Sequence, residues 1–168
     1  VLERQIKRLE QIVSSIHGSA GDDSVLTNEA AEGYFDELKQ RYEQLNFTIQ
    51  VHLKHRVRVT LHDFKLMIDN LTDNSSKYGA QNVVIDITST LKMLTMNFSD
   101  DGIGIPETET KAVFDRYYRI TRESHKHVSG LGMGLYLVQK TVEKYQGKTE
   151  LAQQKKGVQF NITVPNEA

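Results

Sequence analysis

Four residues with side chains suited to chemistry recur at helical spacing: Asn70, Asn74, Lys77 and Tyr78. At 100° per residue they occupy one sector of a helix, roughly 100° wide, beside its apolar stripe. Amide, ammonium and ring groups on a partly buried flank are costly for a purely structural helix. They suit a nucleotide, because an amide oxygen can bind Mg²⁺, an ammonium can bind phosphate and a flat ring can cover a base. Taken alone, a solvated helix flank would be the simpler interpretation.

A second candidate group is a carboxylate at the end of a predicted strand. Leu94, Met96 and Phe98 share one face of that strand, and Asp100 has the same parity, whereas Asp101 points outward. An inward carboxylate without a partner would be costly. It could accept a hydrogen bond from the amino group of adenine, while the glycines that follow let the backbone approach the ring. An Asp-Gly turn would explain those glycines but not the inward carboxylate.

A third motif is a glycine-rich segment, residues 129–135, that leads into a predicted helix. Glycines at this place leave the first N–H groups of the helix facing a phosphate, and the helix dipole favours the negative charge. Such a loop is weak evidence by itself. Between it and the Asp100 motif lie residues 106–129, which are too long for a simple connection and typical of a lid.

In their order along the chain, these motifs resemble the catalytic domain of sensor histidine kinases, in the Bergerat-fold superfamily of ATPases and kinases. Residues 70–78 resemble the N box, and residues 100–104 carry the Asp-x-Gly-x-Gly pattern of the G1 box. Residues 114–119 resemble the F box, and residues 130–134 resemble the G2 box. The resemblance extends over residues 28–165, and four boxes in the right order make a chance match improbable.

The resemblance implies a site for ATP and Mg²⁺. It assigns Asn74 to Mg²⁺ with Asn70 assisting, Lys77 to phosphate and Asp100 to the adenine amino group. Tyr78 would lie against adenine. The other residues that it assigns to the nucleotide come from the G1, F and G2 boxes: Gly102, Gly104, Ile105, Phe114, Arg116, Tyr117, Arg119, Gly130, Leu131, Gly132, Met133, Gly134 and Leu135.

Within this set, the resemblance places Phe114, Tyr117 and Arg119 in a mobile lid. Arg116 or Arg119 would contact the γ-phosphate or the partner domain.

Three positions depart from the family pattern. Val158 follows Gly157 where the family often has threonine, which removes one polar contact near the base. Thr72 and Ser75 replace N-box residues that are usually apolar or small, and their pattern indicates no function.

The residue at position 70 favours a kinase over a hydrolase. Relatives that hydrolyse ATP carry a glutamate there as a base for water, whereas the Asn70 amide cannot accept a proton at neutral pH. Asp69 lies about 100° away on the helical wheel, toward Asp73 and solvent, and cannot replace it. Transfer to histidine needs no such base, because a neutral imidazole nitrogen is already a nucleophile. A regulatory nucleotide-binding module remains an alternative, and a serine kinase of the anti-sigma type is disfavoured by Asn70.

None of the histidines of this chain has the context of a phosphoacceptor. The six candidates are interpreted as surface or loop residues: His17, His52, His55, His62, His125 and His127. The acceptor is therefore expected outside this chain. The resemblance implies four partners or assemblies: ATP, the phosphoacceptor and dimerisation domain of the same protein, a response regulator, and a homodimer of the full-length protein.

Apolar residues near the N-terminus recur at alternating steps of four and three, from Leu2 to Ile16. This is the spacing of a helix that packs along another helix. Residues 1–18 are either a helix folded onto its own domain or the end of a dimerisation and phosphoacceptor helix. Residues 24–168 form the predicted catalytic domain, after a linker rich in glycine and aspartate.

Periodicity predicts helices over residues 28–45, 60–77 and 131–145, the second one starting at a Thr60–Asp63 capping box. It predicts strands over residues 47–53, 57–61, 82–88, 92–99, 149–153 and 158–164. This order predicts a two-layer α/β sandwich with a mixed sheet and one helical layer.

Composition agrees with one globular domain: the 168 residues are 38% hydrophobic and 26% charged. The net charge of −1 gives no reason to expect nucleic acid, and the basic cluster at residues 54–58 has no interleaved aromatic residues. The absence of cysteine is typical of a reducing compartment. We expect a cytoplasmic domain, and the sequence leaves open whether the parent protein is anchored in a membrane.

Overall fold

Alternating apolar residues build a mixed five-stranded sheet in the computed structural model, which describes residues 6, 9, 10, 13, 24–120 and 132–167. The strands lie in the order β1-β2-β3-β5-β4. Neighbours β1 and β2 are parallel, and the other pairs are antiparallel. Their bounds are β1 (Asn46–Leu53), β2 (Asn82–Ser89), β3 (Met93–Asp100), β4 (Lys148–Gln153) and β5 (Val158–Pro165).

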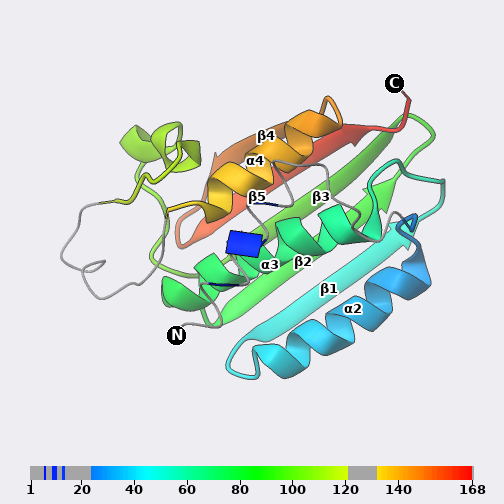
Figure 1. Ribbon diagram of the computed structural model, residues 1–168. Coiled ribbons are helices and arrows are strands. Elements are labelled where there is room, and N and C mark those ends of the chain that lie inside the picture. The colour runs from blue at the N-terminus through cyan, green and yellow to red at the C-terminus, as the bar shows by residue number, and fades with distance from the viewer. Residues whose placement is uncertain (1–5, 7–8, 11–12, 14–23, 121–131, 168) are drawn as a thin grey trace.

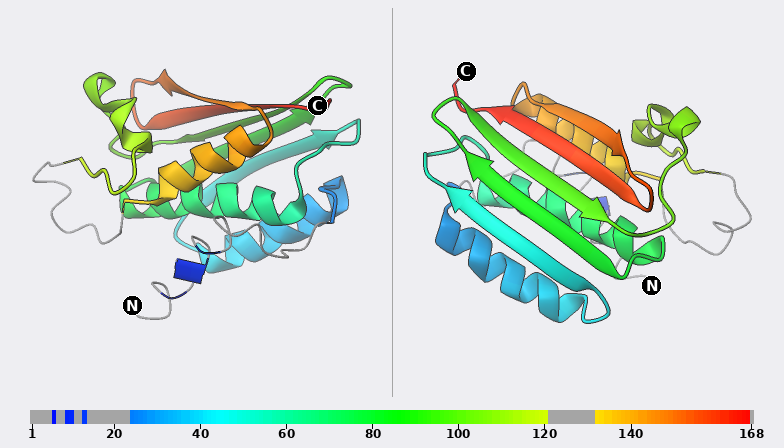
Figure 2. Two further views of the ribbon diagram at one scale, coloured as in Figure 1. Left: turned by 45° about the horizontal axis from the view of Figure 1, so that its top comes forward. Right: turned by 180° about the vertical axis from the view of Figure 1, so that it is seen from behind.

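Three helices cover one face of this sheet (Figure 1): α2 (Asn28–Arg41), α3 (Leu61–Lys77) and α4 (Gly134–Lys144). In the view from behind (Figure 2), the described residues place no helix over the opposite face. Two short 3-10 helices, η1 (Glu107–Glu109) and η2 (Ala112–Phe114), follow β3. The predicted two-layer sandwich with a mixed sheet is therefore confirmed. Within the described residues, no helix combines the length and apolarity needed to cross a membrane.

The core lies between the helical layer and the inner face of the sheet. Every second residue of β2 and β3 is buried there, as the alternation predicts: Val83, Ile85, Ile87, Leu94, Met96 and Phe98. From the helical side, α3 contributes its predicted apolar stripe of Phe64, Met67, Ile68 and Leu71. Removing these apolar surfaces from water is the main stabilising contribution to the fold.

The start and end of α3 agree with the sequence. The Thr60 side chain caps the helix by accepting a hydrogen bond of 3.1 Å from the Asp63 amide. The helix ends at Lys77, followed by Tyr78 as C-cap and by Gly79 with a φ of 77°. Glycine adopts this left-handed conformation without strain, which makes it a common helix terminator.

The predicted strand over residues 57–61 is wrong. Val57 and Val59 are buried as the alternation requires, but Thr60 forms only an isolated bridge, with Val25. This segment does not pair with β1, whose neighbour in the sheet is the parallel strand β2. The segment instead runs along the core toward α3. Two helix ends also differ: α2 stops at Arg41 and α4 starts at Gly134.

Most of the predicted N-terminal unit, residues 1–18, lies outside the described residues. Residues 6, 9, 10 and 13 are helical, and Ile6, Leu9 and Val13 are each about half exposed. Whether this helix belongs to a dimerisation domain stays a prediction.

A buried carboxylate joins the start of α3 to the end of α4. The Tyr145 hydroxyl donates to Asp63 Oδ2 at 2.5 Å, and the Lys144 ammonium lies 2.8 Å from the same oxygen. The Thr60 amide in turn donates to the Tyr145 hydroxyl at 3.3 Å. Burial raises the pKa of Tyr145, and the hydrogen bond to Asp63 adds to this shift. The hydroxyl is thus kept in its neutral, donating form.

We predict that Tyr145→Phe lowers the free energy of unfolding by about 1–2 kcal/mol, because Asp63 loses a donor to its charged group. Urea unfolding at pH 7 measures this difference. The raised pKa means that the stabilisation is complete below about pH 10 and is lost as the pH rises further, so the two proteins should converge at high pH. Tyr136→Phe is the matched control, since no hydrogen bond of its hydroxyl is present in the described part; it should change stability by less than about 0.5 kcal/mol.

Candidate functional site

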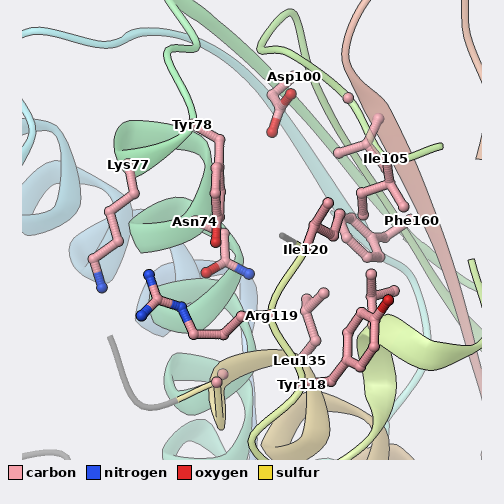
Figure 3. A pocket seen from close by; sticks show the side chains of 15 residues that line it. Asn74, Lys77, Tyr78, Asp100, Ile105, Tyr118, Arg119, Ile120, Leu135 and Phe160 are labelled. Carbon is pink, nitrogen blue, oxygen red and sulfur yellow. The ribbon is translucent and has the colours of Figure 1, made fainter. Parts of the chain in front are cut away.

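A pocket opens where the end of α3, the start of α4, the end of β3 and the start of β5 meet (Figure 3). The segment that follows η2 closes one side of it. Fifteen residues line the pocket: Asn74, Lys77, Tyr78, Asp100, Gly104, Ile105, Val113, Tyr118, Arg119, Ile120, Gly132, Gly134, Leu135, Val158 and Phe160. Ten of these were assigned to ATP or Mg²⁺ from the sequence, and they come from the end of α3, the end of β3 with the loop after it, the segment after η2 and the glycine loop with the start of α4.

One side of the pocket is polar and carries positive charge. Asn74 and Lys77 project from the last turns of α3, and in Figure 3 the guanidinium of Arg119 extends toward them. The Lys77 ammonium pairs with Asp73 Oδ2 at 2.6 Å, one helical turn back, and only 20% of the Lys77 side chain is exposed. An amide oxygen and two cations on one wall are suited to phosphate and a hard metal ion.

Asp100 lies at the other end of the pocket, on the inner face of β3. The parity argument is confirmed, because Asp100 follows the buried Leu94, Met96 and Phe98 on the same face and lines the pocket. Its Oδ1 accepts from the Gly102 amide at 3.0 Å, and its Oδ2 accepts from the Ser75 hydroxyl at 2.5 Å. The half-buried carboxylate is therefore held from two sides, as burial requires.

Asp101 points away from the pocket, as predicted, and has a structural role. It accepts hydrogen bonds from the Asn82 amide at 2.9 Å, from the Asn82 side chain at 2.7 Å and from the Gln81 amide at 2.8 Å. These hydrogen bonds hold the pKa of the Asp101 carboxyl below its usual range. The residue fixes the start of β2 to the end of β3.

The glycines of the Asp100 motif permit close backbone contacts. A Cβ on Gly102 would lie 2.8 Å from the Tyr78 carbonyl oxygen, and one on Gly104 would lie 2.8 Å from the Gly157 carbonyl oxygen. Gly104 also has a φ of 75°, which other residues adopt only with strain. Gly104 and Ile105 line the pocket, whereas Gly102 supports it from behind by holding Asp100.

The glycine loop before α4 lines the same pocket as the polar side chains Asn74, Lys77 and Arg119. Gly132, Gly134 and Leu135 line the pocket, while Met133 is buried and precedes α4 without a side-chain cap. The first N–H groups of a helix have no intrahelical partner, and no side-chain cap is present at α4 among the described residues, so these groups can serve a ligand or water. The assignments of Gly130 and Leu131 lie outside the described residues.

The F-box assignments divide into three groups. Arg119 lines the pocket. Phe114 does not; it is buried, with its ring edge-to-face on Phe160 at a centroid distance of 6.4 Å. Arg116 lies over the Tyr136 ring at 5.5 Å, and Tyr117 is 69% exposed, so neither lines the pocket. Residues 121–129 of the predicted lid lie outside the described residues.

Asn70 does not line the pocket, and its assignment to Mg²⁺ stays a prediction. It is 4% exposed, and its side-chain amide donates to the Leu66 carbonyl oxygen at 2.8 Å. Asp69 was expected to face solvent, but it faces α2: the Tyr34 hydroxyl and the Arg41 guanidinium each lie 2.7 Å from its Oδ1. Burial raises the pKa of the Tyr34 hydroxyl, and the charge of Asp69 raises it further. Neither residue is in place to activate water.

Sequence reasoning missed the apolar lining residues. Val113, Tyr118, Ile120, Val158 and Phe160 line the pocket and were not assigned to the nucleotide. Val158 and Phe160 had a usable signal, because they share the inner parity of β5, which pairs with β3 at Asp100. Val113, Tyr118 and Ile120 belong to an irregular segment, where no periodicity shows which side chains face the pocket. Ser75 was noticed, but its bond to Asp100 was not foreseen.

The described histidines take no part in this site. His52 and His55 are exposed, His62 is half-buried, and none of them lines the pocket. The other three, His17, His125 and His127, lie outside the described residues.

Comparisons with known proteins identify the family. Residues 60–168 match the family model described as histidine kinase-, DNA gyrase B- and HSP90-like ATPase. The chain is 29% identical over 130 residues to the signal transduction histidine-protein kinase ArlS of Staphylococcus haemolyticus, covering 74% of this chain and 28% of that protein. It is 28% identical over 170 aligned positions to ArlS of Staphylococcus aureus (strain USA300), covering 96% of this chain and 38% of that protein. The chain thus spans less than two fifths of the length of these relatives.

The fold agrees with a solved structure of the same class. A mycobacterial sensor histidine kinase, MprB, superposes with a TM-score of 0.66 at 23% identity, covering 82% of this chain and 92% of that one. The chain therefore belongs to the family of histidine kinase-, DNA gyrase B- and HSP90-like ATPases, and within it to the catalytic, ATP-binding domains of sensor histidine kinases.

Proposed function

We propose that this chain is the catalytic part of a two-component sensor histidine kinase, which binds MgATP and donates the γ-phosphoryl group to a histidine outside this chain. The observation that carries the proposal is one pocket with a carboxylate at one end and an amide and two cations at the other. Asp100 lies at the first end, and Asn74, Lys77 and Arg119 lie on the polar wall.

The Asp100 end has the properties of a purine site. Apolar side chains line it, among them Ile105 from the loop after β3 and Val158 and Phe160 from β5. Adenine is flat and presents an amino group that donates hydrogen bonds, which an ionised carboxylate can accept. The ring of Tyr78 lines the same pocket and is proposed to lie against the base.

The polar wall fits a triphosphate with Mg²⁺. Among the described residues, no three His, Cys, Asp or Glu side chains cluster to hold a metal ion. Mg²⁺ commonly takes few protein ligands and completes its shell with phosphate oxygens and water, so the Asn74 amide oxygen is a sufficient protein ligand. The bound ion would supply charge neutralisation of the phosphates. Lys77 and the free N–H groups of α4 would bind phosphate oxygens.

Nothing in the described pocket favours hydrolysis. Asp100, at the base end, is the one carboxylate among the lining residues of the described part. A neutral histidine nitrogen can attack the γ-phosphorus without a base, and the bond from that phosphorus to the β,γ-bridging oxygen breaks as ADP leaves. The acceptor would come from the phosphoacceptor and dimerisation domain of the full-length homodimer, and a response regulator would receive the phosphoryl group next.

We predict that two substitutions weaken nucleotide binding in distinguishable ways. Asp100→Asn should lower the affinity for ATP about 10- to 100-fold with or without Mg²⁺, because it removes a charged acceptor for the base. Asn74→Ala should lower it only when Mg²⁺ is present, because it removes the metal ligand. Titration calorimetry with and without Mg²⁺ measures both effects. Asp86→Asn, on β2 outside the pocket, is the control that should leave affinity unchanged.

We further predict that this chain alone binds MgATP without appreciable turnover, while the full-length protein acquires phosphate on a histidine outside residues 1–168. Mass spectrometry of the full-length protein after incubation with MgATP locates the modified residue. Lys77→Ala in the full-length protein should slow labelling at least about 10-fold, since a charge-assisted contact to phosphate is lost. Rapid release of inorganic phosphate by the isolated chain would contradict the proposed function.

A further inference from the structure

Ser75 has an unexpected partner for a buried N-box residue. It is 1% exposed and follows Asn74 directly on α3. Its hydroxyl oxygen lies 2.5 Å from Asp100 Oδ2 and 3.2 Å from the Leu71 carbonyl oxygen. A hydroxyl has one hydrogen to donate, and the shorter contact to the charged acceptor is the stronger one. Ser75 therefore donates to Asp100.

The remaining surroundings of Asp100 make this hydroxyl important. The Gly102 amide donates to Oδ1, and in the part of the chain that the structure describes Ser75 is the one side chain that donates to the carboxylate. Val158 pairs with Asp100 across the sheet, and its apolar side chain has no donor to offer. One oxygen is thus fixed by the backbone of the loop and the other by α3.

We propose that Ser75 is a positioning residue that orients Asp100 and thereby sets the selectivity of the pocket for a purine with a 6-amino group over one with a 6-oxo group. This inference rests on the proposed function, because it takes the base to lie at Asp100. Each carboxylate oxygen accepts one bond from the protein and keeps a second lone pair.

The physical basis is the match between fixed acceptors and the edge of the base. A 6-amino group offers N–H donors to those lone pairs, whereas a 6-oxo group brings a second acceptor against the carboxylate and leaves both unpaired. Such discrimination is largest when the site cannot rearrange. Without the Ser75 hydroxyl, the carboxylate is anchored only through Oδ1, so it can rotate and admit water between itself and an oxo group.

The same helix provides a matched control. Thr72 lies one turn before Ser75 and is also fully buried, and its hydroxyl has no hydrogen-bond partner within the described residues. Replacing Thr72 with valine removes a hydroxyl of similar burial and keeps the shape of the side chain. Because Thr72 does not contact Asp100, Thr72→Val reports the effect of altering α3 itself.

The test compares ADP with IDP, which carry 6-amino and 6-oxo groups, by titration calorimetry with Mg²⁺ on this chain. The wild type should bind ADP at least about 10-fold more tightly than IDP, as expected for a lost hydrogen bond to a charged group. Ser75→Ala should reduce that ratio about 5- to 10-fold, mainly by weakening ADP binding. Ser75→Thr, which keeps the hydroxyl, should retain more of the ratio than Ser75→Ala, and Thr72→Val should leave it unchanged.

Each contrary result has a distinct meaning. A ratio within twofold of the wild type in Ser75→Ala would overturn the positioning role while leaving the nucleotide site intact. An equal fall of the ratio in Thr72→Val would overturn it as well, by assigning the effect to a loosened helix. Failure of the wild type to bind ADP at all would instead contradict the proposed function. Thermal unfolding of each variant confirms that the comparison is made on folded protein.

Discussion

The contact between the last turns of α3 and the end of β3 determines the shape of the site. Ser75 bonds to Asp100, and the Ile103 amide donates to the Tyr78 carbonyl oxygen at 3.1 Å. No side chain fits between the two elements at Gly102, where an added Cβ would lie 2.8 Å from that same carbonyl oxygen. A polar helix flank and an inward carboxylate, which would each be costly alone, therefore share one cavity and partly satisfy one another.

The antiparallel packing of α3 and α4 explains why the glycine loop arrives at the same place. Asp63, near the start of α3, is bonded to Tyr145 at the end of α4. From there, both Asn74 and Gly134 lie eleven residues along their helices, which is about 16 Å at 1.5 Å per residue. Because the two helices are antiparallel and joined at one end, the Asn74 amide and the start of α4 lie together at the other end. The Asp63–Tyr145 bond thus joins the two helices at the end opposite the pocket.

Sequence reasoning succeeded where a residue lies in a regular element. The helical wheel placed Asn74, Lys77 and Tyr78 on one flank, and strand parity placed Asp100 inward, because both follow from backbone geometry alone. It could not foresee positions that tertiary contacts decide. Phe114 carries an F-box signature and packs into the core, and Asn70 shares the flank yet bonds to its own helix, so their assigned roles stay predictions. The burial of Val57 and Val59 was correct although their strand was not, since alternation reports burial and not pairing.

The kind of reaction follows from how the acidic residues near the site are engaged. Asp69 is bonded to Tyr34 and Arg41 on the α2 side, and Asp73 is paired with Lys77. Asp100 accepts bonds from Ser75 and Gly102 at the far end of the pocket. A hydrolase of this fold needs a carboxylate that is both close to the phosphates and able to take a proton from water. Here each of these carboxylates already has a partner, and position 70 carries an amide, so the described pocket can orient and neutralise a triphosphate but has no group to activate water. This arrangement supports the proposed transfer of the phosphoryl group to a nucleophile brought by another domain.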